Sequence, residues 1–250
     1  MNSKKICIVI PARLESARVP GKVLKKIGDY TMIEQVVRQC LKVADVDTIV
    51  VSDSDEVLAV LKDYKIRTIK TGKCNSGTER IVSVLKDLTD YDYIINVQGD
   101  QPFVSPNLIM SSFQFAQNIQ DENFLVTPIC HVDYENAIKP SCVKTIIDMN
   151  NRAIYFSRSL IPYMNAEANS TEKVLPYYGH HGIYLYNFAA LAAYPDLKIG
   201  QLEQMENLEQ LRFIENGIPI YTVFTSEFHL SVDTPEDYEN ALQYYQQITQ

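Results

Sequence analysis

Positively charged side chains gather directly after the first apolar run of the chain, Ile6–Ile10: within ten residues stand Arg13, Arg18 and Lys22. The apolar run has the aliphatic composition of a buried strand. A strand that leads into a cationic loop and then a helix suits a polyphosphate, because backbone N–H groups and the helix N-terminus face the anion while Arg and Lys neutralise its charge. The glycines of the loop fit neither the P-loop pattern nor the dinucleotide-binding pattern. An ordinary solvated basic loop is the alternative.

Two aspartates stand in loops between apolar segments and predicted helices. Asp100 closes the segment Asn96–Asp100 after an apolar strand, and Asp233 lies within Ser231–Pro235. A carboxylate just beyond the end of a central parallel strand can bind a divalent metal that also contacts a triphosphate. The plainer interpretation is that Asp100 caps the next segment and that Asp233 is an accessory cap beside Thr234. Together with the cationic loop, the two acids predict a site for Mg²⁺ and a nucleotide.

The first half of the chain alternates predicted strands and helices, which must position these loops. Strands are expected at Lys5–Ile10, Thr48–Val51, Arg67–Lys70 and Tyr93–Val97, and helices at Met32–Val43, Asp55–Tyr64 and Glu79–Leu88. Such alternation predicts right-handed βαβ units on a parallel sheet, where ligands lie beyond the carboxyl ends of the strands. The loops 11–22 and 98–102 both leave strands at that edge.

The pattern changes after residue 120. Strands are expected at Phe124–Cys130, Val143–Asp148, Ile154–Ser157, Gly182–Tyr186 and Ile218–Phe224, and helices at Leu202–Glu215 and from Thr234 onward. The polar segment Pro162–Pro176 is typical of a mobile loop. We therefore predict one α/β domain over residues 1–250, with a mostly parallel central sheet, helices on both faces and an inserted mixed β lobe. Its two parts would be residues 1–120 with the C-terminal helix, and residues 121–230.

Composition narrows the class of protein. The chain has 250 residues, 46% of them hydrophobic and 22% charged, and a formal net charge of −8. The acidic balance opposes binding to nucleic acid or to an anionic membrane surface. The five cysteines show no C-x-x-C spacing, which favours a reduced cytoplasmic protein. No apolar run approaches the roughly 20 residues that a membrane span needs, so we expect a soluble protein.

The candidate residues belong to motifs that recur along nearly the whole chain. The segment Pro11–Lys22 resembles the A-R-x-x-S-x-R-x-P-G-K signature of the 3-deoxy-manno-octulosonate (Kdo) cytidylyltransferases, or CMP-Kdo synthetases. Further segments resemble motifs of the same family in the same order: Ser76–Arg80, Asn96–Asp100, Tyr155–Ser159, Ile161–Pro162, His180–Tyr184, Leu208–Arg212 and Val232–Asp237. The related CMP-sialate synthetases share the fold and the reaction, but their loop pattern is not found here.

The resemblance implies a nucleotide-diphospho-sugar transferase (Rossmann-like) fold, a need for Mg²⁺ and a homodimer. The implied reaction joins CTP and Kdo to give CMP-Kdo and pyrophosphate, as a cytoplasmic step toward lipopolysaccharide or capsule. Two alternatives stay open. The chain could activate a related 2-keto-3-deoxy or acid sugar, such as amino-Kdo or a sialic-acid-like sugar, or it could be an inactive homologue that binds nucleotide sugars.

The resemblance also assigns roles to residues. The catalytic set would be Arg13, Arg18, Lys22, Asp100 and Asp233, and the two aspartates would bind the metal. The nucleotide would contact Arg13, Ser16, Arg18, Lys22, Ser76, Gly77, Thr78 and Arg80. The sugar acid would contact Gln98, Arg158, His180, Tyr184, Glu209 and Gln210. Each residue of the sugar set also has a structural interpretation as a surface ion pair, a core residue or a helix-packing residue, and His181 is expected to be structural.

Some positions depart from the family pattern. Glu15 stands in the phosphate loop where a small neutral residue is usual, so its carboxylate would repel a triphosphate unless it points away or pairs with a cation. Ala17 replaces a hydroxyl residue, and Gln101 stands where Glu is common. These departures leave the identity of the sugar and the affinity for CTP open.

Overall fold

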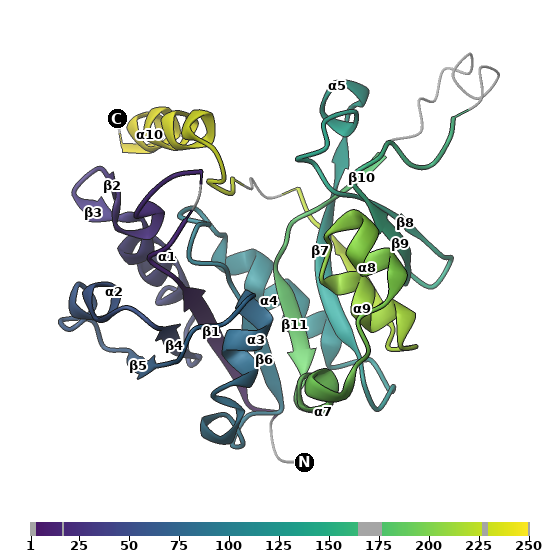
Figure 1. The fold of residues 1–250 in the computed structure, drawn as a ribbon, viewed down its shortest axis with the longest axis horizontal. Helices are drawn as coiled ribbons and strands as arrows, with labels where there is room; N and C mark the ends of the chain where they lie inside the picture. The colour runs from purple at the N-terminus through teal and green to yellow at the C-terminus, as the bar shows by residue number, and fades with distance from the viewer. Residues whose placement is uncertain (1–3, 17, 165–176, 227–229, 250) are drawn as a thin grey trace.

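The computed structural model describes residues 4–16, 18–164, 177–226 and 230–249. Its centre is a ten-stranded sheet with strand order β5-β4-β1-β6-β11-β7-β10-β8-β9, and β12 pairs with β7 outside that path (Figure 1). The strands are β1 (Ile6–Ala12), β4 (Asp47–Ser52), β5 (Arg67–Lys70), β6 (Tyr93–Asn96), β7 (Leu125–Val132), β8 (Lys144–Ile147), β9 (Ala153–Ser157), β10 (Tyr177–His180), β11 (Tyr184–Asn187) and β12 (Ile220–Phe224). Ala17 and most of the predicted polar loop, residues 165–176, lie outside the described residues.

The N-terminal part of the sheet is parallel. β1 pairs in parallel with both β4 and β6, and β4 pairs in parallel with β5. β11 then runs antiparallel to β6 and to β7, whereas β12 is parallel to β7. The strands of the second part therefore continue the same sheet. The predicted mixed α/β class with a mostly parallel centre is confirmed.

Helices cover both faces of the sheet. They are α1 (Met32–Cys40), α2 (Asp55–Ala59), α3 (Gly77–Val82), α4 (Pro106–Ala116), α5 (Tyr134–Ala137), α7 (Phe188–Ala193), α8 (Gln201–Glu206), α9 (Gln210–Glu215) and α10 (Pro235–Thr249). Short 3₁₀ turns cover Lys22–Leu24, Leu85–Asp87 and Tyr194–Asp196, and β2 (Lys26–Ile27) pairs with β3 (Tyr30–Thr31) as a small hairpin.

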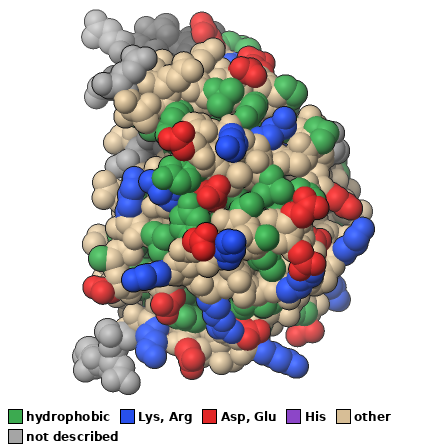
Figure 2. Space-filling model, turned by 90° about the vertical axis from the view of Figure 1, so that its left-hand side faces the viewer, with side chains coloured by type: hydrophobic (Ala, Val, Ile, Leu, Met, Phe, Trp, Pro, Cys, Tyr) green, Lys and Arg blue, Asp and Glu red, His purple; other side chains and the backbone are tan. Residues whose placement is uncertain are grey.

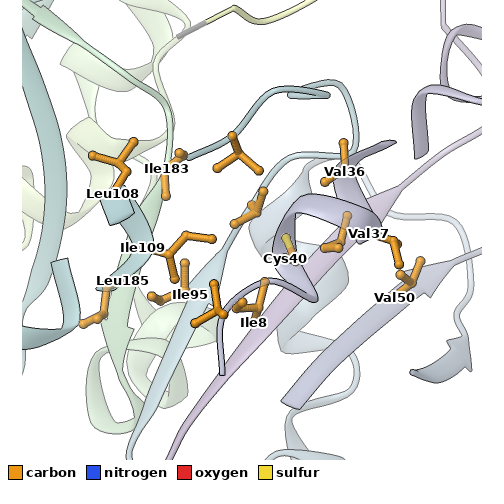
Figure 3. Close-up of a cluster of buried hydrophobic side chains, with 14 of the residues drawn as sticks. Ile8, Val36, Val37, Cys40, Val50, Ile95, Leu108, Ile109, Ile183 and Leu185 are labelled. Carbon is orange, nitrogen blue, oxygen red and sulfur yellow. The ribbon is translucent and has the colours of Figure 1, made fainter. Parts of the chain in front are cut away.

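Alternate residues of the strands supply two separate cores. Ile8 of β1 and Ile95 of β6 face a cluster with Val36 of α1 and Ile109 of α4 (Figure 3). Cys7 and Val9 face the opposite side, where they pack with residues of α3, α7 and α9. The two-residue period of a strand sends successive side chains to opposite faces, so an uninterrupted apolar run is what a sheet covered on both sides requires.

Three predicted helices differ from the structure: α2 and α3 end before their predicted C-termini, at Ala59 and Val82, and the third is divided in two. Leu202–Glu215 was expected to be continuous, but α8 ends at Glu206, Asn207 adopts a left-handed conformation with φ 52°, and α9 begins at Gln210. Asn tolerates this conformation better than most residues. The apolar spacing was compatible with one helix, because Leu202, Leu208 and Leu211 all pack on the same core.

The C-terminal helix returns to the N-terminal half of the molecule. α10 lies beside the β2–β3 hairpin and α1 (Figure 1), where Ala241 and Val232 pack with Ile27, Met32 and Phe103. Gly28, at φ 66°, leaves room for the Tyr245 ring, since a Cβ there would lie 2.2 Å from that ring. Within the part of the chain that the structure describes, no helix is long and apolar enough to cross a bilayer.

Candidate active site

Two aspartates and two cations from distant parts of the chain meet beyond the carboxyl ends of β1 and β6. Lys22 Nζ lies 2.7 Å from Oδ2 of Asp100 and 3.4 Å from Oδ1 of Asp233. Arg18 Nη2 lies 3.2 Å from the same Asp233 oxygen. The strand-end loops predicted to converge do so, and the cations lie beside the carboxylates.

Asp100 is not a simple helix cap. One carboxylate oxygen bonds Lys22, while Oδ1 is buried and has no hydrogen-bond partner within the described chain. Burial raises the pKa of Asp100, the Lys22 ammonium opposes that shift and the Asp233 charge adds to it. A buried carboxylate oxygen without a partner costs free energy, so this oxygen is poised for a ligand that carries positive charge.

The side chain of Asp233 does not cap α10, because other residues do so. The start of α10 is capped by Thr234, whose hydroxyl accepts from the Asp237 N–H at 3.1 Å. Asp237 Oδ2 in turn accepts from the N–H groups of Asp233 and Thr234. The side chain of Asp233 is left to face Arg18 and Lys22. A hydrogen bond of 3.0 Å from the Val232 N–H to the Asp100 carbonyl joins the two acidic loops.

A cavity of about 160 Å³ opens between these loops. Its lining includes nine of the predicted site residues: Arg13, Ser16, Lys22, Ser76, Gly77, Arg80, Gln98, Asp100 and Asp233. Gly99 allows the loops to approach, because a Cβ there would lie 3.2 Å from the Pro11 carbonyl oxygen. The cavity is therefore lined by the cationic loop after β1, the start of α3 and the loop after β6.

Glu15 also lines this cavity, at its exposed edge. Its carboxylate lies 3.5 Å from Lys73 Nζ, and the two side chains are 86% and 85% exposed. The charge of Glu15 is thus paired with a cation and solvated, which weakens its repulsion of an anion in the cavity.

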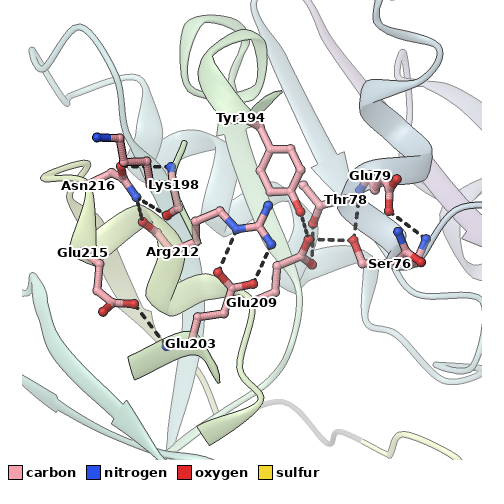
Figure 4. A network of polar contacts seen from close by, with 11 residues as sticks. Ser76, Thr78, Glu79, Tyr194, Lys198, Glu203, Glu209, Arg212, Glu215 and Asn216 are labelled. Carbon is pink, nitrogen blue, oxygen red and sulfur yellow. Dashed lines mark hydrogen bonds and ion pairs between the residues drawn. The ribbon is translucent and has the colours of Figure 1, made fainter. Parts of the chain in front are cut away.

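The start of α3 is fixed by a carboxylate from the far half of the chain. Ser76 caps α3 by accepting from the Glu79 N–H at 3.1 Å. The Ser76 and Thr78 hydroxyls donate to the two oxygens of Glu209 at 2.6 and 3.0 Å, and the Tyr194 hydroxyl also bonds Glu209 (Figure 4). Glu209, predicted beside the sugar acid, therefore bonds the first turn of α3, whose residues were predicted to contact the nucleotide.

Arg80 is buried beneath the same edge. Its guanidinium lies 3.1 Å from Asp53 Oδ2 and 3.1 Å from the Gly72 carbonyl oxygen, and it also bonds the Thr71 hydroxyl. These bonds tie the loop after β5 to α3. Arg80 lines the cavity, but these hydrogen bonds all join it to other parts of the protein rather than to the cavity.

Arg158 follows β9 and is surrounded by backbone carbonyl groups. Its guanidinium donates to the carbonyl oxygens of Glu206, Pro140 and Asn207 at 3.0, 3.2 and 3.5 Å. Glu206 Oε2 accepts from the Arg158 backbone N–H at 2.9 Å. Glu206 carried no signal in the sequence, because its partners lie 48 to 51 residues away along the chain.

The remaining sugar-side residues lie on and around β10, β11 and α9. The rings of His180 and Tyr184 lie 5.2 Å apart between centroids, and Gln98 donates to the side chain of Asn96. The Tyr184 hydroxyl and Gln210 Nε2 are buried without a hydrogen-bond partner among the described residues. Two such unsatisfied groups are compatible with a polar ligand.

His181 follows β10, whose last residue is His180, and its environment differs from that of His180. Its side chain is 3% exposed, and burial lowers its pKa to about 4. Its carbonyl oxygen accepts from Gln101 Nε2 at 3.1 Å. Gln101 is thus engaged with the frame of the site, beside Asp100 but directed elsewhere.

The two aspartates fit a magnesium ion better than a metal that needs an all-protein cage. Among the residues described, no group of three or more His, Cys, Asp and Glu side chains forms a metal cluster. Mg²⁺ commonly uses one or two carboxylates, keeps several waters and completes its shell with substrate phosphates. The unpartnered Oδ1 of Asp100 supplies a suitable hard oxygen.

The side of the molecule that carries α2 and β5 shows no block of one charge. In Figure 2 the Lys and Arg side chains on this face alternate with Asp and Glu. A face of mixed charge does not supply the continuous positive field that attracts nucleic acid.

Comparison with known proteins places this site in a family. The cytidylyltransferase family profile matches residues 7–222. The chain is 40% identical to a 3-deoxy-manno-octulosonate cytidylyltransferase of Leptospira interrogans, covering 94% of both chains. It is 37% identical to the protein of the same name from Rickettsia massiliae, covering 100% of this chain and 98% of the relative.

Solved structures agree. A CMP:2-keto-3-deoxy-manno-octonic acid synthetase complexed with CTP superposes with a TM-score of 0.90 and 34% identity, over 98% of this chain and all of the other. A putative glucose-1-phosphate thymidylyltransferase from Bacillus anthracis, at 16% identity and a TM-score of 0.68, shares the fold alone. The sequence motifs, the sheet and the full-length similarity lead to one conclusion: the chain belongs to the 3-deoxy-manno-octulosonate cytidylyltransferase family.

Proposed function

We propose that this protein transfers the cytidylyl group of CTP to the sugar acid Kdo, forming CMP-Kdo and pyrophosphate. The observation that carries the proposal is the convergence of Lys22, Asp100 and Asp233 at one end of the cavity. These groups lie far apart in the sequence, and the solved structure that superposes on this chain with a TM-score of 0.90 is complexed with CTP.

The chemistry must bring two anions together. Arg13, Arg18 and Lys22 would offset the charge of the triphosphate and of the departing pyrophosphate, and the planar guanidinium of Arg158 suits the sugar carboxylate. We assign Asp100 and Asp233 as the ligands of Mg²⁺, which when bound would neutralise phosphate charge and lower the pKa of the attacking hydroxyl. Such transfers depend on positioning and electrostatics, so we assign no covalent nucleophile.

The setting of the reaction is also proposed from the resemblance. We infer a homodimer in the cytoplasm whose product serves lipopolysaccharide or capsule assembly. Light scattering on the purified protein tests the dimer: a mass near twice the 28.5 kDa of the chain supports it, and a mass equal to one chain contradicts it.

The test of the activity is pyrophosphate release from CTP and Mg²⁺ with Kdo, amino-Kdo or sialic acid in parallel reactions. Release with Kdo that is lost in Asp100→Asn and Asp233→Asn, with unchanged circular dichroism, supports the proposal. Release with another sugar acid only would retain the chemistry and change the substrate. The absence of release with any sugar, despite CTP binding, would contradict the proposal and support an inactive binding protein.

A further inference from the structure

We propose that Glu206 is a positioning residue that sets Arg158 for the sugar acid; this rests on the function proposed above. Glu206 is the last residue of α8, directly before the left-handed Asn207 that separates α8 from α9. Its carboxylate bonds residues at the end of β9. The break between the two helices therefore has a consequence for the site.

The Glu206 carboxylate gathers three donors from one strand end. It accepts from the Ser157 hydroxyl at 2.5 Å, the Tyr155 hydroxyl at 3.1 Å and the Arg158 N–H at 2.9 Å. Burial opposes its ionisation, but the bonds from Ser157, Arg158 and Tyr155 outweigh burial and hold the pKa of Glu206 below its ordinary value. The residue is therefore a carboxylate near neutral pH, able to accept all three bonds.

Lys144 holds Arg158 from the other side. Its side chain is completely buried in β8, and Nζ donates to the carbonyl oxygens of Arg158, Cys142 and Lys139 at 2.7, 2.6 and 3.2 Å. The backbone N–H of Arg158 thus bonds an anion, and its carbonyl oxygen bonds a cation. Charge-assisted hydrogen bonds are stronger than neutral ones, so both ends of this one residue are fixed.

This clamp leaves the Arg158 guanidinium oriented but not neutralised. A guanidinium has five N–H donors, and three of them bond carbonyl oxygens of the frame within the described chain. Carbonyl oxygens carry no net charge, so the cation keeps donors and positive charge for a ligand. A carboxylate is the ligand class that a guanidinium binds best, because its oxygens match the planar arrangement of the N–H donors.

Glu206 and Glu209 also join the two halves of the site. Glu209 bonds Ser76 and Thr78 at the start of α3, whereas Glu206 bonds the end of β9. The four-residue connection 206–209 therefore contacts the nucleotide side with one carboxylate and the sugar side with the other. A change at Glu206 should affect the sugar acid far more than CTP.

The chain offers a matched control in the same helix. Glu203 pairs with Arg212 through two bonds of 2.6 and 2.8 Å, and its side chain is 12% exposed (Figure 4). Glu203→Gln neutralises a largely buried carboxylate in α8 that pairs with Arg212 rather than with Arg158. Glu206→Gln keeps the shape of the side chain but replaces one acceptor oxygen by an NH₂ group. That group would face the donors that bond Glu206 in the wild type.

The experiment compares both variants with the wild type in steady-state kinetics. We expect Glu206→Gln to raise KM for Kdo about tenfold to a hundredfold, with KM for CTP changed less than about twofold, because a small misplacement of a binding group is costly. Ser157→Ala, which removes one bond to Glu206, should shift KM for Kdo in the same direction by a smaller factor. Glu203→Gln should change neither constant.

Thermal unfolding with and without Kdo supplies a second readout. Kdo should stabilise the wild type and Glu203→Gln but stabilise Glu206→Gln much less. Equal Kdo constants and equal Kdo stabilisation in the two Gln variants would overturn the inference. A wild type that releases no pyrophosphate with Kdo would instead contradict the proposed function, so the two failures are distinguishable.

Discussion

The ammonium of Lys22 lies 2.7 Å from Oδ2 of Asp100, and this ion pair joins the loop after β1 to the loop after β6. Burial holds the pKa of Asp100 above its ordinary value despite that cation. For an acid whose pKa is raised on folding, the stabilising contribution is present at low pH and is lost as the pH rises through the folded-state pKa. The charged form at pH 7 therefore opposes folding.

Asp100→Asn should consequently separate stability from activity. We expect pyrophosphate release to fall by about 10²–10³-fold, while the melting temperature at pH 7 rises, because the neutral amide avoids the cost of burying a charge. The rise should shrink as the pH falls and wild-type Asp100 becomes protonated. Asp148→Asn is the control, because hydrogen bonds hold the pKa of Asp148 below its ordinary value, so neutralising it should not raise the melting temperature. A melting temperature for Asp100→Asn below that of the wild type would contradict this account.

Buried His181 predicts a pH dependence of opposite sign. Its pKa is lowered from 6.5 to about 4 by burial, so the unfolded state binds a proton more tightly than the folded state below pH 6.5. The stabilising contribution is complete above pH 6.5 and is lost as the pH falls toward 4.

His181→Leu should remove the loss of unfolding free energy that His181 causes as the pH falls. Between pH 7 and pH 4.5 the wild type should lose about 2–3 kcal/mol more free energy of unfolding than the variant. Urea denaturation at the two pH values measures the difference. The exposed His131 supplies the control variant His131→Gln, which should keep the wild-type dependence. Parallel pH profiles for wild type and His181→Leu would show that His181 titrates normally.

Glu15 and Lys73 form an exposed pair at the mouth of the cavity. Surface ion pairs contribute little to stability, so Glu15→Gln should leave the melting temperature unchanged. Removal of a negative charge near the triphosphate should lower KM for CTP by about two- to fivefold at low salt. The effect should fade at high ionic strength, and a KM that does not respond to salt would rule out a charge effect.

Glu209 is expected to act on the nucleotide side. Glu209→Gln places an amide donor among the Ser76, Thr78 and Tyr194 hydroxyls, which should cost about 2 kcal/mol of unfolding free energy and raise KM for CTP. Tyr194→Phe removes one of these bonds and should have a smaller effect in both measurements. A rise in KM for Kdo with no change in KM for CTP would contradict this prediction. It would support the direct contact between Glu209 and the sugar acid that the family resemblance implies.

Gly28 tests the docking of α10. Gly28→Ala adds a Cβ that would lie 2.2 Å from the Tyr245 ring, at a φ of 66° that L residues rarely adopt. Gly217→Ala, at φ 77° with nothing within 4 Å, carries the backbone strain without the collision. Gly217→Ala should cost about 1 kcal/mol, and Gly28→Ala should cost more and also reduce activity, since α10 carries Asp233 on its N-terminal side. Equal losses in the two variants, measured by denaturation, would show that Tyr245 moves aside freely.

The elements predictable from sequence were those that local pattern determines. Arg67–Lys70 matches β5 residue for residue, and the other parallel strands are displaced by at most two residues, because continuous aliphatic runs are typical of strands buried on both faces. α4 was not predicted, although Ser105 and Pro106 form a recognisable helix start. The interruption at Asn207 could not be read from spacing, because the leucines on either side pack against the same core.

The site divides in the same way. The sequence predicted that Lys22, Asp100 and Asp233 lie in one site, because loops at the carboxyl edge of a parallel sheet converge. The order of the family motifs along the chain supported the same prediction. The role of Glu206 could not be predicted from the sequence, because no residue near it in the sequence indicates that Tyr155 and Ser157 bond it. Long-range hydrogen bonds of this kind become visible only when the strands are in place.

The late position of Asp233 has a consequence for biosynthesis. Lys22 is synthesised first and Asp100 after it. Asp233, which bonds Lys22, is synthesised more than two hundred residues after Lys22. A nascent chain that stops short of Asp233 lacks one of the two acids, whatever the state of its sheet. The acidic pair is therefore completed only after all the described strands of the sheet have been synthesised.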